Sequence, residues 1–263
     1  MLDENFFISP FIIFTSMTMC YTGAKADTSK QLKKLLNLNG LNDQDINEQI
    51  KDLLNNVNSK LGSDVLISVC NKIYPNVGFE VKKDFVDNIT KTFHGEVQQV
   101  DYSDPVKSSK TINDWVASKT NNKIQNLISP ESINHLVELI LVNAIYFKGN
   151  WLEKFDAQNT SPEDFNLADG SKVKVNMMKL NGKYFNVMYD IEGLDATLCK
   201  IPYAGEKISM TIILPNEGVS LNDVEKQMNT KMIQDVLGRK FYREKVNVHL
   251  PKFKMEYEIE VFF

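Results

Sequence analysis

The side chains best suited to catalysis are three histidines, and they form no recognisable catalytic pattern. Nucleophilic catalysis needs a nucleophile, a base and a group that orients the base. His94 lies beside a glycine that ends a predicted helix, His135 in a helix-to-strand connection, and His249 in an alternating strand. The sequence has no G-x-S-x-G, P-loop, G-x-G-x-x-G or H-E-x-x-H motif. We therefore expect no enzyme activity, with a triad built from distant residues left open as the alternative.

The cysteines and the glycosylation sequons give weaker signals. Cys20, Cys70 and Cys199 are isolated and odd in number, and they match neither a zinc-ligand spacing nor a disulfide framework. We therefore expect buried free thiols, with no metal and no cofactor. N-glycosylation sequons occur at Asn88 and Asn159, and they matter only if the protein is secreted.

The most unusual polar residue is an amide inside an apolar run. Asn143 interrupts LILVNAIYF, the sequence of Leu139–Phe147. A buried amide without partners costs a few kcal/mol, and its two donors and one acceptor all need partners. The run itself is typical of a central strand buried on both faces. We therefore expect Asn143 to have a specific role and specific partners.

Composition and charge limit the classes of partner. Hydrophobic residues make up 43% of the chain and charged residues 24%, as in ordinary globular proteins. The net charge is −4 without a long basic run, which argues against nucleic acid and heparin-like polyanions as partners. No apolar segment approaches the roughly 20 residues that span a bilayer, so we expect no membrane insertion. The segment FFISPFIIF lacks the features of a signal peptide.

Helical patterns come first along the chain and strand patterns later. Ser9 can cap a helix whose first turn holds Pro10 and which stops near Gly23. Asparagines near residue 121 can end a later helix in the left-handed conformation. From Leu139 onward short strands are separated by turn signals, among them the NG pair at 181–182. Further helices are expected at 27–38, 41–61, 80–95, 104–128, 220–228 and 231–238, and early strands at 64–76 and 96–102. This order favours an α+β fold.

Segments along the whole chain resemble the serpin family. NFFISPFIIFTSMTMCYTGAKADTSKQL resembles serpin helix B, and INDWVASKTNNKIQNLI is similar to helix F. NKIYPNVGFEVKKDFVDNITKTFHGEVQQVDY resembles the second A-sheet strand, helix E and the first A-sheet strand, and LILVNAIYFKGNW the third A-sheet strand. VKVNMMKLNGKYF, LCKIPYAGEKISMTIILPNEG and VNVHLPKFKMEYEIE match later sheet segments. The resemblance implies one truncated domain over 1–263, with helices B to F at about 10–128 and a sheet-rich part at about 138–263. Its helices would pack on a central mixed A-sheet, with B- and C-sheets, incomplete at both ends.

The resemblance also implies a mechanical function. Serpins inhibit serine endopeptidases when an exposed reactive loop is cleaved and inserts into sheet A as an extra strand. Asn143 and Ser9 match the family's shutter, a buried polar network beneath the central strands. Trp151 and Lys252 match the breach, where insertion begins. The alternatives are a plain helix cap for Ser9, a strand-end aromatic for Trp151 and a solvated amine for Lys252.

The sequence departs from the family pattern in two ways. The helix B motif SPxS has a second serine where this chain has Ile12, so we expect a simpler shutter in which Asn143 bonds Ser9, water or nearby backbone. The hinge, the reactive bond and the closing strands would follow KMEYEIEVFF, and helix A would precede NFFISP. We therefore expect the chain alone not to inhibit proteases. We also expect it to self-associate, swap an element or bind a C-terminal fragment.

The alternative is a non-inhibitory serpin-like interaction protein. The identity of the target protease is encoded in the reactive loop and is not predicted. The sequons, together with the usual secretion of family members, favour an extracellular parent protein, whereas the free cysteines favour a cytoplasmic one.

Overall fold

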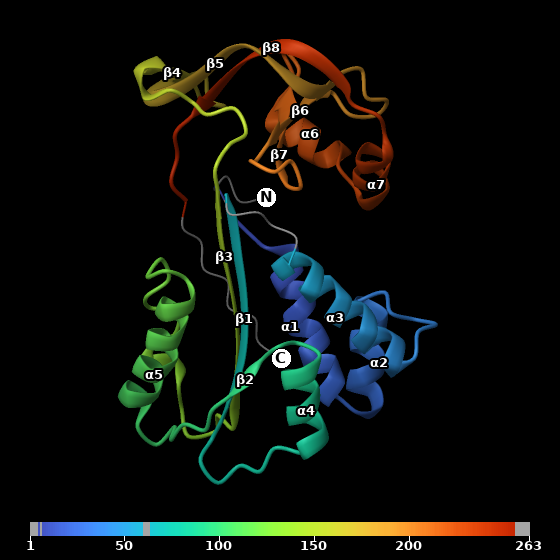
Figure 1. Ribbon diagram of the computed structural model, residues 1–263, viewed down its shortest axis with the longest axis vertical. Helices are drawn as coiled ribbons and strands as arrows, with labels where there is room; N and C mark the ends of the chain where they lie inside the picture. The colour runs from blue at the N-terminus through green and yellow to red at the C-terminus, as the bar shows by residue number, and fades with distance from the viewer. Residues whose placement is uncertain (1–4, 6, 60–63, 256–263) are drawn as a thin grey trace. The chain divides into compact units, whose positions relative to one another are not determined.

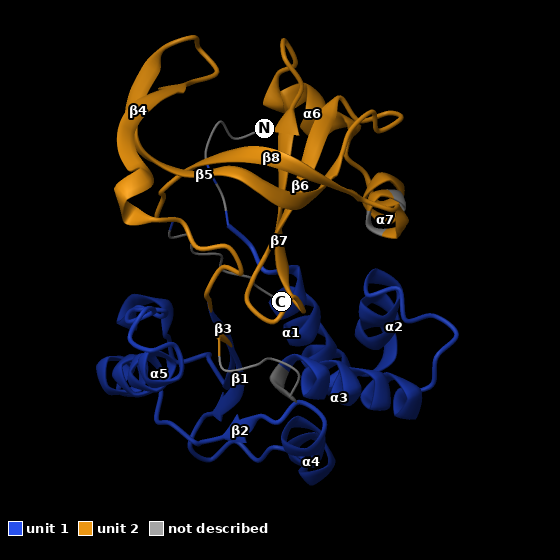
Figure 2. Ribbon diagram, turned by 45° about the horizontal axis from the view of Figure 1, so that its top comes forward, with its two compact units in different colours: residues 1–61, 66–148, 255–263 blue, residues 62–65, 149–254 orange. Residues whose placement is uncertain are grey.

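The computed structural model describes residues 5, 7–59 and 64–255, and it forms two compact units (Figure 2). Unit 1 comprises residues 1–61, 66–148 and 255–263, and unit 2 comprises residues 62–65 and 149–254. Residues 256–263, on which the last expected sheet segment partly falls, lie outside the described residues. The expected α+β class is confirmed, because helices dominate unit 1 and strands dominate unit 2.

Unit 1 packs helices against a three-stranded mixed sheet of order β2-β1-β3 (Figure 1). β1 (Val65–Pro75) and β2 (Glu96–Val97) are parallel. β3 (Leu139–Gly149) lies on the other side of β1, and β1 and β3 both reach the boundary with unit 2. The described helices of this unit are α1 (Pro10–Gly23), α2 (Ala26–Leu35), α3 (Asp43–Ser59), α4 (Lys83–Lys91), α5 (Pro105–Lys119) and the 3-10 helix η1 (Pro130–Ser132).

The start and the end of α1 follow the sequence expectation. The Ser9 hydroxyl accepts a hydrogen bond from the Ile12 N–H at 3.3 Å, and Pro10 occupies the first turn. Gly23 is the last residue of the helix, and a Cβ there would lie 3.0 Å from the Phe85 ring, so the position has little room for a side chain. The helix thereby approaches α4 closely at its carboxyl end.

Two apolar clusters hold unit 1 together. The first joins α1, α2, α3 and α4 to β1 through side chains that include Met19, Ile46, Ile73 and Phe93. The second lies between α5 and the sheet; its buried members are Tyr74, Val100, Tyr102, Ile112, Val116, Ile133, Val142 and Ala144. Helices α1 to α4 therefore pack on the sheet through the first cluster, and α5 packs on it through the second.

The expectation that β3 is a central strand buried on both faces is wrong for the described structure. β3 is an edge strand, because its second edge has no partner strand among the residues that the structure describes. Val142 and Ala144 are buried, but Phe147 near its carboxyl end is 40% exposed. Asn143 nevertheless lies between two buried residues.

Unit 2 is built on five antiparallel strands. β4 (Thr160–Asn166), β5 (Lys172–Met188), β6 (Ala196–Pro202) and β7 (Ser209–Pro215) follow one another in the sheet, and β8 (Tyr242–Pro251) pairs with β5. Two helices expected from the sequence, α6 (Leu221–Gln227) and α7 (Thr230–Gly238), pack on it through a cluster that contains Val224 and Val236. A short 3-10 helix, η2 (Ala157–Asn159), precedes β4.

The turn expected at residues 181–182 is instead a bulge inside one long strand. β5 continues through this point, and its register against β8 shifts between Leu180 and Lys183. Gly182 has φ +62°, and its N–H donates to Asn247 Oδ1 at 2.8 Å. An extra residue in a strand increases its local twist without ending it, and for this reason the NG pair does not reverse the chain here.

A cluster of charged and aromatic side chains fastens α5 to β1 and β2. The Lys72 side chain in β1 is only 7% exposed, and its Nζ lies 3.2 Å from Glu96 Oε2. This Nζ also lies 5.0 Å from the centre of the Tyr74 ring and 5.1 Å from that of Trp115. From α5, Trp115 Nε1 donates to Glu96 Oε2 at 3.0 Å and Lys119 Nζ lies 2.8 Å from Glu96 Oε1. Glu96 is thus the anion shared by all three elements.

Replacing Glu96 with Gln is expected to destabilise unit 1 at neutral pH, because a buried ammonium loses its counter-charge. Hydrogen bonds and charge from Lys119 and Lys72 hold the pKa of Glu96 below its usual range. The stabilisation is therefore complete above the unfolded pKa of about 4.3 and is lost as the pH falls through the lower folded value. Urea unfolding between pH 7 and pH 3, followed by tryptophan fluorescence, measures this difference.

The matched control is Asp114→Asn on the same helix, whose exposed pair with Lys110 should contribute less than about 1 kcal/mol. A difference between wild type and Glu96→Gln that stays constant from pH 7 to pH 3 would contradict the role of the Glu96 charge.

Candidate functional site

Asn143 lies at the centre of a polar network inside unit 1. Its Oδ1 accepts from Ser16 Oγ at 2.7 Å, and its Nδ2 donates to Asn71 Oδ1 at 2.6 Å. The same Nδ2 lies 3.2 Å from Met19 Sδ. Asn71 Nδ2 in turn donates to the Phe93 carbonyl at 2.7 Å. Both donors and the acceptor of the Asn143 amide are therefore satisfied within the protein.

The network has one consistent direction. A backbone carbonyl only accepts, so the Phe93 contact fixes the Asn71 amide with its oxygen toward Asn143. Asn143 must then present its NH₂ to Asn71 and its oxygen to Ser16. The single hydroxyl proton of Ser16 is thereby drawn toward Asn143, although its Oγ also lies 2.9 Å from the Ile12 carbonyl. The bonds run from Ser16 to Asn143 to Asn71 to Phe93.

Three elements position these side chains. Ser16 and Met19 lie three residues apart on α1 and so face the same side of the helix. Asn71 is 3% exposed in β1, and Asn143 comes from β3. Buried amides in a low-dielectric interior are costly unless fully paired. The network therefore specifies how α1, β1 and β3 pack together.

The expected pairing of Asn143 with Ser9 is wrong. Ser9 acts as the helix cap, and the hydroxyl that reaches Asn143 comes from Ser16. Ser16 lies four residues after Ile12, so it occupies the same face of α1 one turn later. The sequence predicted that, because Ile12 replaces a serine, α1 would offer Asn143 no hydroxyl besides that of Ser9. This prediction is wrong, because Ser16 supplies one. The assignment of Ser9 and Asn143 to a working shutter stays a prediction.

Sequence reasoning missed both Ser16 and Asn71. The four-residue spacing from Ile12 to Ser16 was a usable signal, because i and i+4 share a face. A second signal was the alternation of Asn71 with the buried Ile73 in β1, since i and i+2 share a face of a strand. Neither signal identifies Asn143 as the partner without the tertiary structure.

The two predicted breach residues lie in unit 2, each with different neighbours. Trp151 is half-buried and stacks on Tyr203, with ring centres 4.3 Å apart and an interplanar angle of 11°. Phe155 meets the same indole edge-on at 6.1 Å. Lys252 is exposed, and its main-chain N–H donates to the Asn176 carbonyl at 2.8 Å. The stacking of Trp151 agrees with its alternative as a strand-end aromatic, and both breach roles stay predictions.

The cysteines are half-buried rather than fully buried, and they are free thiols. Burial raises the pKa of the Cys20 and Cys199 thiols, which disfavours the reactive thiolate. His94 bonds Asn55 Oδ1 through Nε2 at 3.0 Å. Among residues 5, 7–59 and 64–255, no group of three or more His, Cys, Asp or Glu side chains could hold a metal ion. No helix in this part of the chain is long and apolar enough to cross a membrane.

The two sequons differ in accessibility. Asn88 lies within α4, is half-buried, and donates from Nδ2 to Asn47 Oδ1 at 3.3 Å. Asn159 is exposed at the end of η2. Glycan addition needs an accessible amide nitrogen on the surface, so the geometry favours Asn159.

Similarity to known proteins identifies the family of this chain. The model of the family Serpin (serine protease inhibitor) matches residues 2–262. The chain belongs to the serpin family. Serpin B6 of Macaca fascicularis is 36% identical over 263 residues, which cover 98% of this chain and 69% of that protein. Leukocyte elastase inhibitor of Equus caballus is 34% identical over 260 residues, covering 96% and 67%.

Solved serpin structures agree with this assignment. Serpin48, described as a highly specific serpin of the insect Tenebrio molitor, superposes with a TM-score of 0.85 at 30% identity, over 96% of this chain and 67% of that one. The fold is therefore that of a serpin. The chain spans about two thirds of the length of these relatives.

Replacing Ser16 with Ala is expected to destabilise unit 1 by about 1 kcal/mol, because the half-buried Asn143 oxygen loses its donor. Thermal and urea unfolding measure the change. Ser118→Ala is the control, since that hydroxyl donates only to the Trp115 carbonyl at 2.6 Å on an exposed helix face. Equal losses for the two variants would show that Ser16 contributes no more than an ordinary helix hydroxyl.

Expression through a secretory pathway is expected to place glycan on Asn159 and not on Asn88. Glycosidase treatment followed by peptide mass spectrometry measures occupancy at each asparagine. Asn159→Gln should abolish the glycan and Asn88→Gln should leave it unchanged. Glycan found on Asn88 would contradict the burial and hydrogen bonding of that side chain.

Proposed function

We propose that this chain forms the sheet-bearing body of a serpin that inhibits serine endopeptidases by inserting a cleaved reactive loop into sheet A. The observation that carries the proposal is the polar network beneath the sheet, in which β3 contributes Asn143. Serpin family membership and relatives named as protease inhibitors support it. Insertion of a strand is a known use of β-strand addition.

The edge position of β3 agrees with this proposal. Strand insertion needs a row of unpaired backbone groups, which an edge strand offers. β3 has no second partner among the described residues, and Asn143 lies in its middle. A shift of β3 during insertion would break the bonds from Ser16 and to Asn71 together. The network therefore opposes movement of β3 until a new strand supplies compensating hydrogen bonds.

We further propose that residues 1–263 on their own do not trap a protease. These residues contain no segment that resembles the hinge or the reactive bond of the family. The action is mechanical, and no catalytic group of this chain takes part. We also propose an extracellular parent protein, supported by the exposed sequon at Asn159. Serine proteases are its proposed partners.

The second candidate is a serpin-like interaction protein without inhibitory activity. The feature that favours it is Ile12, which replaces the second shutter serine of the family pattern. Ser16 weakens this argument, because it supplies a hydroxyl to Asn143 from the next turn. The two candidates differ in one outcome, which is whether a covalent protease complex forms.

Mixing residues 1–263 with trypsin-like and chymotrypsin-like proteases is expected to give no SDS-resistant complex. If the transcript encodes further residues after Phe263, the longer polypeptide is expected to form one. Protease with its active-site serine blocked is the control, since an acyl bond is required. A complex from residues 1–263 alone would refute loop insertion, and a longer polypeptide that is only degraded would favour the interaction protein.

A further inference from the structure

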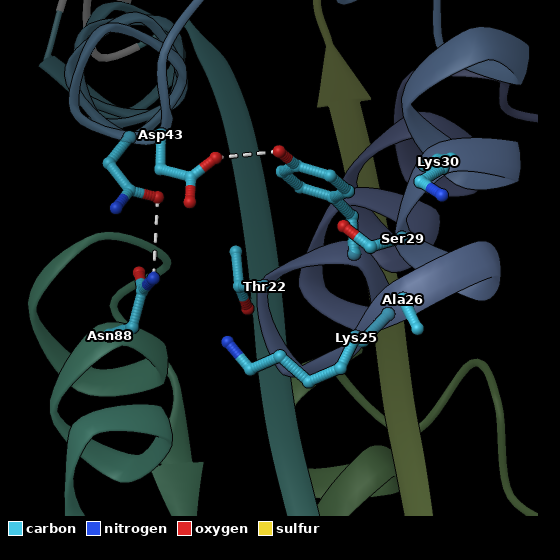
Figure 3. A pocket seen from close by; sticks show the side chains of 10 residues that line it. Thr22, Lys25, Ala26, Ser29, Lys30, Asp43 and Asn88 are labelled. Atoms are coloured by element: carbon cyan, nitrogen blue, oxygen red, sulfur yellow. Dashed lines mark hydrogen bonds between the residues drawn. The ribbon is translucent and has the colours of Figure 1, made fainter.

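A polar cavity of about 300 Å³ lies within unit 1, away from the Asn143 network (Figure 3). It is formed by the carboxyl end of α1, the start of α2, the start of α3 and the middle of α4. Its volume falls at the lower end of the range of small-molecule pockets, which is about 300–1,000 Å³. The side chains that matter for recognition are Tyr21, Thr22, Lys25, Asp43 and Asn88.

Asp43 is held in place by Tyr21. The Tyr21 hydroxyl donates to Asp43 Oδ1 at 2.6 Å. Burial, and then the neighbouring Asp43 carboxylate, raises the pKa of Tyr21 to about 12, so the hydroxyl remains a donor at neutral pH. Figure 3 shows the second carboxylate oxygen turned away from Tyr21, toward the space between Asn88 and Thr22. This oxygen can accept from a ligand.

Asn88 lines the same cavity and carries an unsatisfied acceptor that is closed off from solvent. Its Nδ2 donates to Asn47 Oδ1 at 3.3 Å, while its own Oδ1 is buried and has no hydrogen-bond partner. Turning both amides over would only exchange the unpartnered oxygen for an unpartnered nitrogen. A buried polar atom left unpaired costs about 1–3 kcal/mol. Because this oxygen is closed off from solvent, recognition of a ligand in the cavity rests on the charged groups of Asp43 and Lys25.

Lys25 supplies the opposite charge. Its ammonium has no ion-pair partner among the described residues, whereas the neighbouring Lys30 pairs with Asp27 at 3.0 Å. In Figure 3 the Lys25 side chain extends below Asn88 and Thr22, across the cavity from Asp43. The cavity thus has a carboxylate at one end and an ammonium at the other, with amide and hydroxyl groups between them.

We propose that this cavity binds a small zwitterion. The ammonium group of the ligand faces Asp43, and its carboxylate faces Lys25. A simple anion would be attracted by Lys25 but repelled by Asp43. A simple cation would be attracted by Asp43 but repelled by Lys25. Complementary charge at both ends selects a ligand that carries both signs. Such a site is separate from the strand movement proposed for sheet A.

The test measures binding of ω-amino acids to the intact chain by NMR. The probes are glycine, 4-aminobutanoate and 6-aminohexanoate, with butylamine and butanoate as ligands that each carry one of the two charges. At least one amino acid should shift resonances of Tyr21, Thr22 and Asn88, with a Kd at least tenfold below those of butylamine and butanoate. The chain length that binds best reports the distance between the two charged ends.

Variants assign each end of the ligand. Lys25→Met should weaken the best amino acid about tenfold and strengthen butylamine, because the variant removes the like charge that butylamine meets. Asp43→Asn should also weaken the best amino acid about tenfold and should strengthen butanoate for the same reason. Asp43→Asn keeps an acceptor for Tyr21, and a thermal melt checks that each variant is folded. Lys34→Met, an exposed lysine of α2 outside the cavity, is the matched control and should change nothing. No binding of any amino acid at millimolar concentration, or equal binding by all variants, would overturn the proposal and leave water as the occupant.

Discussion

The half-buried amide of Asn143 constrains how three elements of unit 1 pack together. It lies between two buried residues of β3 and is satisfied by a hydroxyl from α1 and an amide from β1. Its contacts with Ser16 and Met19 therefore join β3 to α1, and its hydrogen bond with Asn71 joins β3 to β1. A shift of any one of these elements leaves a buried donor or acceptor unpaired, which is a larger penalty than the net gain from one hydrogen bond.

The same sheet is fastened from the α5 side by a different kind of interaction. There Glu96 links a buried lysine of β1 to two side chains of α5, and the rings of Tyr74 and Trp115 lie next to the Lys72 ammonium. The amide network around Asn143 stabilises the packing through directional hydrogen bonds. The Glu96 cluster stabilises it mainly through charge. Movement of β3 alone would disturb the first, whereas lifting α5 would disturb the second. In the proposed strand insertion, the network around Asn143 can therefore rearrange while the Glu96 cluster stays intact.

Local signals in the sequence predicted the elements well and the contacts poorly. The cap at Ser9, the end of α5 at asparagines with positive φ, and the late helices α6 and α7 all followed from residue type and spacing. The partner of Asn143 did not, because Thr15, Ser16 and Thr18 all place their hydroxyls near carbonyls of the preceding turn. Only tertiary packing decides which of these hydroxyls turns toward the sheet. The bulge in β5 was missed for a similar reason, since an NG pair fits both a hairpin and a twisted strand.

The position of the donor hydroxyl on α1 couples two sites of that helix. Ser16 supplies the hydroxyl that reaches the half-buried oxygen of Asn143, and Ile12 occupies the same face of α1 one turn earlier. Residue choice at these two sites is therefore interdependent: the hydroxyl of Ser16 can be lost at low cost only if another donor on this helix face replaces it.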